Sequence, residues 1–408
     1  MDLEIRPIAE DEVDRYVTAI ESAFHVIPST EDLRHSRALL EPERTLAVFD
    51  GPDVVGSTAA YSLQLTVPGG IVPMAGVTAV AVLPSHRRRG ILTELIRRQL
   101  DDVHRRGEVL AGLWASEGSI YQRFGYGLAT LHGWFGIDRT RIAFARPLDP
   151  DPGRIRMVSK DDALLAMPPV YERVRPAIPG FVDRSQAWWD ALFSDLEEHR
   201  RGAGPLLFAL HQTAGDIDGF VAYRVKNDWS EGWPASEAMV DELIAATPSA
   251  YAALWSFVLN LDVVGKISAW GRPADEPLFH MMAEPRRLLF GVSDAMWLRL
   301  VDVPAALARR SYAAEGELSF AVRDSFCLWN EGTFRMAVRS GRAEVRRDDG
   351  ATPHIELDVS DLGAAYLGGV TFTRLHDAGR VAAASEEALR IADDLFRTHR
   401  APWCPHIF

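Results

Sequence analysis

The stretch MAGVTAVAVLPSHRRRGILTELIRRQL, Met74 to Leu100, decides the fold of its region because its pattern changes in the middle. The first part is a nearly continuous apolar run, which is typical of a strand buried on both faces. From Ile91 the apolar residues recur at helical spacing, while Glu94 and Arg97–Gln99 fill the other side. Three arginines and a glycine, Arg87–Gly90, separate the two patterns. The stretch therefore predicts a strand, a basic loop and an amphipathic helix.

The flanking sequence extends this unit into a mixed α/β domain. Apolar residues at helical spacing predict a helix over Glu10–Phe24, and strand-like runs follow from Thr45 onward. Downstream, EVLAGLWAS (Glu108–Ser116) and GLATLHGWFGI (Gly127–Ile137) predict two more strands with a short helix between them. We assign residues 1–150 to this first domain.

Two further domains are predicted beyond a linker. The segment ARPLDPDPGR, Ala145–Arg154, is rich in proline and acidic residues, as linkers often are. Residues 151–287 again mix strands with a helix over Ser249–Leu261, but no arginine–glycine loop precedes that helix. Residues 288–408 contain their own alternating strands and helices. The predicted fold class is α+β, with mixed α/β regions.

Composition excludes several functions. The 408 residues carry a formal net charge of −13, which argues against general binding of nucleic acid or anionic membranes and favours a cationic partner. The chain has neither a long apolar run nor an apolar signal segment at its acidic start, so we expect a cytoplasmic protein. Two cysteines, Cys327 and Cys404, predict neither a disulfide framework nor a metal site.

The basic loop is an exception in this acidic chain. A helix that starts after Gly90 has free backbone N–H groups and the positive end of its dipole in front of it. Arginines there add charge-assisted bonds to phosphate oxygens, and the glycine lets a ligand approach the backbone. The arrangement suits a pyrophosphate. A merely solvated loop remains the alternative, whereas a nucleic-acid site conflicts with the net charge.

Two segments resemble the GNAT acyltransferase superfamily. Arg87-Arg88-Arg89-Gly90-Ile91-Leu92 resembles its RxxGxG/A loop, with Leu92 where a small residue is usual. Tyr121, three residues before Phe124-Gly125-Tyr126, resembles the helix tyrosine that serves there as general acid. A phenol can protonate the thiolate that leaves when an amine attacks a thioester. Tyr126 is the second candidate for this role, and simple helix packing is the alternative for Tyr121.

VTAVAVLPSHRRRG, SEGSIYQRFGYG and the terminal APWCPHIF together resemble the Eis (enhanced intracellular survival) family of N-acetyltransferases. The resemblance covers essentially the whole chain. It implies two tandem GNAT-like regions, of which only the first binds acetyl-CoA, followed by a sterol-carrier-protein-like domain. It also implies a homohexamer that acetylates amines, including those of aminoglycosides and lysine side chains.

The same resemblance implies the site residues. The general acid is Tyr121, and the general base is the C-terminal carboxylate of Phe408. The residues expected to bind acetyl-CoA are Val80, Ala81, Val82, Arg88, Arg89, Gly90, Ile91, Leu92, Thr93, Ser116 and Glu117. No metal is implied.

Departures from the family pattern concern the acceptor. Phe24–Thr30 and the following RHSRALL show no clear acidic residue and tryptophan of the kind that lines the aminoglycoside pocket, and Ile407 replaces a penultimate acid. We therefore expect weaker or narrower use of aminoglycosides and polyamines. A protein or peptide lysine is the alternative acceptor, and a non-catalytic acyl- or lipid-binding protein is the second alternative.

Overall fold

The computed structural model describes residues 3–148, 153–230 and 232–408. The expected linker, Ala145–Arg154, includes residues 149–152, which lie outside the described residues. The described chain divides into two compact units. The second unit is Leu131–Asp294 with Trp403–Pro405, and the first contains the rest.

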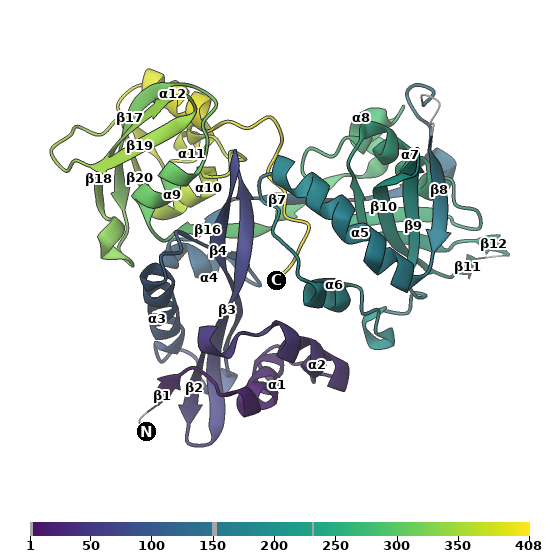
Figure 1. Cartoon of the computed structure of the whole chain (residues 1–408), viewed down its shortest axis with the longest axis horizontal. Helices are drawn as coiled ribbons and strands as arrows, with labels where there is room; N and C mark the ends of the chain where they lie inside the picture. The colour runs from purple at the N-terminus through teal and green to yellow at the C-terminus, as the bar shows by residue number, and fades with distance from the viewer. Residues whose placement is uncertain (1–2, 149–152, 231) are drawn as a thin grey trace. The chain divides into compact units, whose positions relative to one another are not determined.

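The first unit is built on a mixed sheet whose strand order differs from the order along the chain (Figure 1). From edge to edge its strands are β1 (Glu4–Arg6), β2 (Thr45–Asp50), β3 (Asp53–Val67), β4 (Gly70–Val82), β5 (Leu110–Trp114), β16 (Met296–Leu300) and β6 (Gly127–Leu128). β16, which comes from far along the chain, pairs with both β5 and β6. The sheet that carries the basic loop therefore needs a strand from beyond residue 287.

Helices cover both faces of this sheet because its strands alternate their side chains. Ala47 and Phe49 of β2 join the core with α1 (Val13–Ala23), whereas Val48 between them packs with α3 (Ile91–Arg105). Both helices agree with the apolar periodicity of the sequence. Two more helices of this region are α2 (Thr30–Leu39) and α4 (Gly118–Tyr121).

One side chain of α3 was expected on its polar side but is buried. Gln99 is only 4% exposed, and its amide accepts from the hydroxyl of Thr58 at 3.0 Å and donates to the carbonyl of Ala59 at 2.9 Å. The reason is a β-bulge: Ala79 and Val80 of β4 have only Thr58 opposite them. Gln99 thus satisfies polar groups beside the irregular pairing, which helical periodicity cannot reveal.

The second unit has a sheet of its own. Its strands in order are β15 (Gly291–Asp294), β7 (Leu131–Asp138), β14 (Lys266–Pro273), β13 (Glu237–Ala245), β10 (Asp216–Lys226), β9 (Leu207–Thr213) and β8 (Arg154–Val158). Its helices are α5 (Lys160–Val174), α6 (Gln186–Leu192), α7 (Pro248–Leu259) and α8 (Leu278–Met281), and β11 (Trp229–Ser230) pairs with β12 (Trp233–Pro234).

The predicted single strand over Gly127–Ile137 is wrong. The run is interrupted at Ala129 and Thr130, whose backbone N–H groups both donate to the carbonyl of Met296 at 3.1 Å. Its two parts therefore enter different sheets, β6 the first and β7 the second.

The C-terminal region of the first unit forms a third sheet. Its strands in order are β19 (Arg342–Arg347), β18 (Gly332–Arg339), β17 (Gly316–Arg323), β20 (Ile355–Asp358) and β21 (Ala382–Ala383), and its helices are α9 (Val303–Arg309), α10 (Val359–Ala365), α11 (Phe372–Asp377) and α12 (Glu386–Phe396).

A buried ion pair joins this region to the first sheet. Arg299 of β16 is completely buried and donates to the carboxylate of Asp324 at 2.6 Å. Close backbone contact adds to the ion pair, because a Cβ on Gly127 of β6 would lie 1.7 Å from the carbonyl oxygen of Ser360 in α10. The first sheet and the C-terminal region therefore pack as one body.

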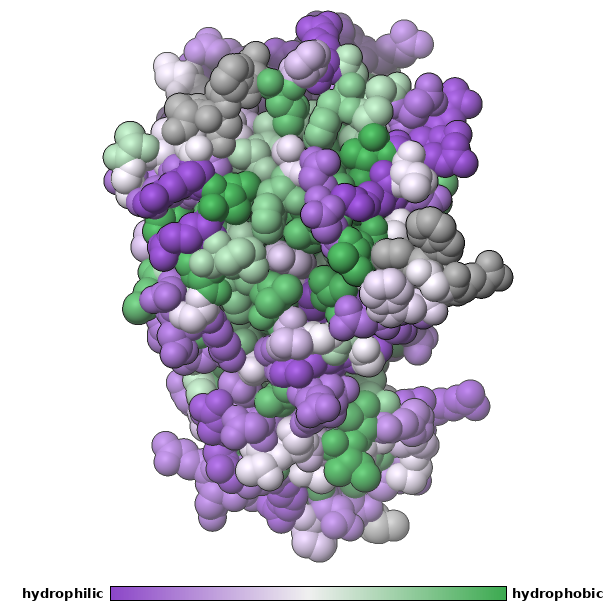
Figure 2. Space-filling view, turned by 90° about the vertical axis from the view of Figure 1, so that its right-hand side faces the viewer, coloured by the Kyte–Doolittle hydropathy of each residue, from purple (hydrophilic) through white to green (hydrophobic). Residues whose placement is uncertain are grey.

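On the face drawn in Figure 2, apolar residues gather in the upper half and hydrophilic residues predominate below. Among the described residues, no helix combines the length and apolar character that a membrane crossing requires.

Candidate active site

Strands β4 and β5 run parallel but separate before they end. Their pairing joins Met74–Gly76 to Leu110–Gly112, whereas β4 continues to Val82 and β5 to Trp114. A cavity of about 440 Å³ lies at these strand ends, where open α/β sheets usually bind ligands. It is lined by nearly all the residues predicted to bind acetyl-CoA: Val80, Ala81, Val82, Arg88, Gly90, Ile91, Leu92, Thr93, Ser116 and Glu117.

The backbone conformation of the basic loop leaves the start of α3 uncapped by a side chain. Arg88 (φ 63°) and Gly90 (φ 81°) are both left-handed, and Gly90 is the N-cap of α3 with no side chain capping the helix. The N–H groups of the first helical turn therefore face the cavity end of the loop. A Cβ on Gly90 would meet no atom within 4 Å, so the space before the helix is open.

The three arginines are not equivalent. Arg88 lines the cavity as predicted, whereas Arg89 does not. Arg87, which was not predicted as a ligand, lines the cavity and donates from Nε to the carbonyl of Val82 at 3.2 Å. Two of the three guanidinium groups are thus placed near the open helix end.

Tyr121, at the end of α4, is one of the residues that this cavity shares with a second pocket. It lines both spaces and is 5% exposed. Burial, with a smaller contribution from the charge of Glu117, raises the pKa of Tyr121 to about 12. Its phenol is therefore protonated at neutral pH and can donate a proton. Tyr126 is fully buried and lines neither space, so the geometry favours Tyr121 over Tyr126.

The second pocket has a volume of about 270 Å³. Phe408 reaches it, and a Cβ on Gly76 of β4 would lie 3.2 Å from the Phe408 ring. The indole N–H of Trp114 donates to the carbonyl of His406 at 2.9 Å, which fixes the last residues against β5. The pocket is lined by Val17, Ile20, Glu21, Phe24, Ser36, Leu40, Tyr61, Val77, Thr78, Ala79, Val80, Leu113, Trp114, Ser116, Tyr121 and Phe408.

Sequence reasoning missed an acid and a tryptophan in this pocket. It searched the segments after Phe24, whereas Glu21 comes from α1 and Trp114 from the end of β5. The signal for Glu21 was present, because Val17, Glu21 and Phe24 share one side of a helix at spacings of four and three. Trp114 could not be found this way, since its place depends on how β5 pairs.

Comparison with family models supports this description of the fold. Models described as acetyltransferase (GNAT) domains match residues 4–129 and 180–300, and a sterol carrier protein domain matches residues 303–405. The chain is thus an acetyltransferase of the GNAT class, and this class uses acetyl-CoA as acetyl donor. The predicted α+β fold, with tandem GNAT regions and a sterol-carrier-protein-like end, is confirmed.

Relatives define the family more narrowly. An uncharacterized N-acetyltransferase of Streptomyces avermitilis is 39% identical over the full length of both chains. The N-acetyltransferase Eis of Mycobacterium tuberculosis is 36% identical over 88% of each chain. The crystal structure of Eis1 from Mycobacterium abscessus matches with a TM-score of 0.84 and 38% identity, covering 99% of this chain and all of the other. The chain belongs to the Eis family of N-acetyltransferases.

Proposed function

We propose that the protein transfers the acetyl group of acetyl-CoA directly to a primary amine of a cationic small molecule, with both substrates bound together. The observation that carries this proposal is Tyr121, which forms a wall shared by the cofactor cavity and the second pocket. Val80 and Ser116 line both spaces as well, so a thioester held along β4 is open to the second pocket. We assign the second pocket to the acceptor.

The basic loop and the open edge of β4 support the assignment of this cavity to acetyl-CoA. Within the described ranges, the pairing of β4 with β5 ends at Gly76, so the backbone of Val80–Val82 can pair with the pantetheine amides on that side. The N-terminus of α3 with Arg87 and Arg88 suits the pyrophosphate. A backbone N–H near Val82 would polarise the thioester carbonyl.

The transfer needs one acid and one base. The amine nitrogen forms a bond to the acetyl carbonyl carbon, and the carbon–sulfur bond breaks. Tyr121 donates its phenolic proton to the leaving thiolate. The carboxylate of Phe408 accepts the proton that the amine loses, directly or through water. A terminal carboxylate has a reference pKa of about 3.5, so it acts chiefly by holding the amine and orienting its proton.

The terminal carboxylate is tested by adding one glycine after Phe408. The extension moves the carboxylate while it leaves Phe408 and its contact with Gly76 in place. We expect kcat, followed as free thiol released from acetyl-CoA, to fall about 10²-fold. A Phe408→Leu variant, which keeps the chain end, is the matched control and should lose less. Unchanged turnover in the extended protein would exclude the carboxylate as base.

The acceptor panel should include an aminoglycoside, a polyamine and a lysine peptide. Aminoglycoside-type or polyamine acceptors are the first choice, because an acidic protein attracts cations. Faster transfer to the peptide would favour the alternative of protein lysine acetylation. No thiol release with any amine would favour the alternative of an acyl- or lipid-binding protein. The homohexamer and the cytoplasmic location are carried forward as predictions, and light scattering after gel filtration tests the first.

A further inference from the structure

The segment that carries the proposed acid continues into a tight turn. Tyr121 is followed by a single 3-10 turn, η4 (Gln122–Phe124), and by Gly125, whose φ of +83° is left-handed. The backbone N–H of Gly125 donates to the carbonyl of Gln122 at 2.9 Å, and that of Tyr126 donates to the carbonyl of Tyr121 at 3.3 Å. The position of Tyr121 therefore depends on what holds this turn.

A loop of the C-terminal region packs against the turn. It is the β17–β18 loop, residues 324–331, and the ring of its Phe326 meets that of Phe124 edge to face, with 5.0 Å between the centroids. Cys327 of the same loop belongs to the apolar core cluster that contains Tyr121. The loop thus supplies part of the packing around the proposed acid, although the two are far apart in the chain.

The carboxylate of Asp324 orders this loop. One of its oxygens accepts from the backbone N–H groups of Phe326 at 3.2 Å and Cys327 at 2.9 Å. The other accepts from the guanidinium of Arg299 at 2.6 Å and the amide of Asn330 at 3.1 Å. Asp324 is only 1% exposed, so these four donors take the place of water around its charge.

Arg299 extends this order to the turn. A Cβ on Gly125 would lie 1.9 Å from Nη1 of Arg299 and 2.6 Å from its Cζ. The guanidinium therefore lies directly against the backbone of the turn, and only glycine leaves room for it. Arg299 is completely buried, and Asp324 balances its charge. A shift of the Asp324 carboxylate would thus shift the guanidinium and the turn that follows Tyr121.

We infer that the β17–β18 loop of the sterol-carrier-protein-like region positions the general acid, with Phe326 and the Asp324–Arg299 pair as its points of contact. The inference rests on the proposed function, in which Tyr121 protonates the leaving thiolate. None of these three side chains is among the described residues that line the two substrate spaces. They are therefore positioning residues, and the C-terminal region contributes more to the transfer than the chain end that it carries.

The first test is a double-mutant cycle between Phe326→Leu and Tyr121→Phe. Phe326→Leu removes the ring contact and keeps an apolar side chain at the position. We expect it to lower kcat about tenfold when Tyr121 is present, because a small displacement of the acid slows the transfer. In the Tyr121→Phe background it should change kcat by less than about twofold, because no acid remains to be positioned. The rate of thiol release from acetyl-CoA gives kcat for all four proteins.

A merely structural role would give another pattern, since it acts whether or not Tyr121 is present. An equal loss of kcat in both backgrounds, or no loss in either, would overturn the inference. The KM for acetyl-CoA should stay within about twofold. A tenfold rise in KM would place the effect in α3, whose Arg97 lies 4.5 Å from the centroid of the same ring, and would also overturn it. Leu328→Ala, in the same loop but 69% exposed, is the matched control and should change neither constant.

Asp324→Asn tests the second point of contact. It leaves the guanidinium of Arg299 buried without its charge partner, so the protein should unfold at a lower denaturant concentration. We expect kcat to fall at least about tenfold, because the guanidinium no longer has a fixed place against Gly125. If Asp324→Asn does not fold, the cycle on Phe326 decides the question.

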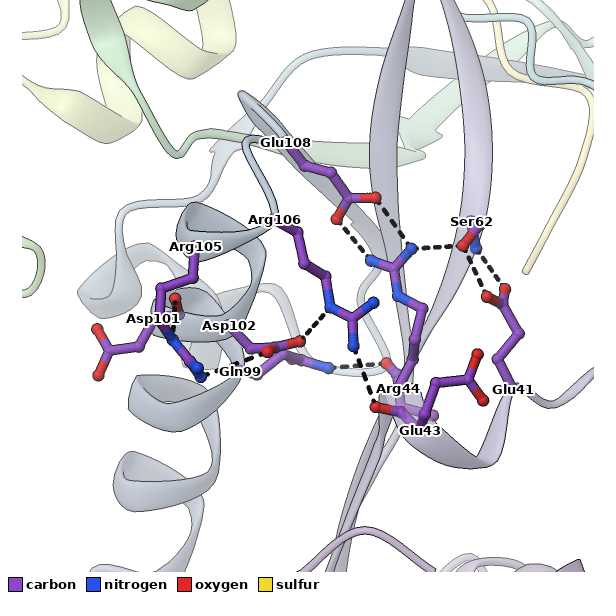
Figure 3. A network of polar contacts seen from close by, with 11 residues as sticks. Glu41, Glu43, Arg44, Ser62, Gln99, Asp101, Asp102, Arg105, Arg106 and Glu108 are labelled. Carbon is purple, nitrogen blue, oxygen red and sulfur yellow. Dashed lines mark hydrogen bonds and ion pairs between the residues drawn. The ribbon is translucent and has the colours of Figure 1, made fainter.

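Glu108→Gln is the matched control for this variant. Glu108 is also the carboxylate partner of a buried arginine, because it accepts from Arg44 at 2.9 Å and 2.6 Å (Figure 3). The residues labelled in Figure 3 lie outside residues 121–126. Glu108→Gln should therefore lower the denaturation midpoint without lowering kcat. An equal fall of kcat in Asp324→Asn and Glu108→Gln would contradict the inference.

The two proposals fail differently. If no amine at all releases thiol from acetyl-CoA, the proposed function is wrong. If Tyr121→Phe is fully active, the assignment of the acid is wrong and the inference falls with it. If Tyr121→Phe is slow but Phe326→Leu is as fast as the wild-type protein, only the positioning inference is wrong.

Discussion

Burial separates two tyrosines that the sequence places five residues apart. Tyr121 is nearly buried yet lines both substrate spaces, whereas Tyr126 is fully enclosed, and their rings meet edge to face at 6.1 Å between centroids. Burial raises the pKa of both phenols. Under the proposed mechanism the acid is therefore Tyr121, which lines both spaces, and not Tyr126, which lines neither.

Tyr121→Phe should lower kcat about 10²-fold, since it removes the proton donor and keeps the ring. The KM for acetyl-CoA should stay within about twofold, because the ring contacts remain. Tyr126→Phe is the matched control and should leave kcat unchanged. The rate of thiol release from acetyl-CoA gives kcat for both variants. Full activity in Tyr121→Phe would move the acid role elsewhere.

The expected pH dependence of kcat follows from the direction in which the pKa of Tyr121 is shifted. The pKa of Tyr121 is raised from 10.0 to about 12, so the protonated, donating form persists to higher pH than in a free phenol. We expect kcat of the wild-type protein, measured at saturating substrates from about pH 7 to pH 10, to show no alkaline loss from this group. A decline that disappears in Tyr121→Phe would contradict this expectation.

At the scale of elements, the loop between β4 and α3 depends on backbone conformation more than on its side chains. Gly90 supplies a left-handed residue directly before the helix, and Arg88 adopts the same region. A side chain at Gly90 would be strained by its φ of +81° although there is room for it. The N–H groups of the first turn of α3 are thereby held toward the cavity that we assign to acetyl-CoA.

Gly90→Ala should cost about 1 kcal/mol of unfolding free energy and raise the KM for acetyl-CoA about tenfold. Gly51→Ala in the turn between β2 and β3 is the matched control, because Gly51 also has a positive φ (+61°) and open space around it. It should lose similar stability without a change in KM. Denaturant titration and thiol release measure the two effects. If Gly90→Ala and the wild-type protein have equal KM values for acetyl-CoA, the loop does not take part in cofactor binding.

The same elements show what the sequence could predict. The strand, loop and helix around Gly90 follow from local signals, and the structure has them as expected. The bulge at Ala79–Val80 and the burial of Gln99 do not, because both depend on pairing with β3. Likewise Glu21 was within reach of helical periodicity, whereas Trp114 and Phe408 meet in one pocket only through tertiary structure.

For the whole molecule, strand exchange links sequence regions that look independent. β16 lies between β5 and β6 of the first sheet, although nearly the whole second unit separates it from them in the chain. No local sequence pattern predicts that β16 pairs with β5 and β6, because the sequence of β16 is that of an ordinary apolar strand. Residues 1–150 thus lack an interior strand of their sheet, the one that joins β5 to β6.

Residues 1–150 expressed alone should not fold cooperatively, because β5 and β6 would keep unpaired edges. The matched design replaces Leu131–Asp294 by a short glycine–serine linker. Thr130 and Ala295 are hydrogen-bonded at 3.1 Å, so a short linker can join them, and this chain should fold. Thermal unfolding followed by circular dichroism tests both the 1–150 fragment and the chain with the linker. A cooperative transition in the 1–150 fragment would contradict the prediction.

The position of β16 also has a consequence for biosynthesis. Ribosomes release the chain from its N-terminus at roughly 5–20 residues per second, so β5 and β6 emerge long before the strand that joins them. Until β16 has been made, the half-built sheet exposes the unpaired strand edges of β5 and β6. Phe408 lines the pocket that we assign to the acceptor, so a chain clipped before Phe408 lacks part of that pocket's wall. Under the proposed mechanism, a chain that does not reach Phe408 should therefore not transfer the acetyl group.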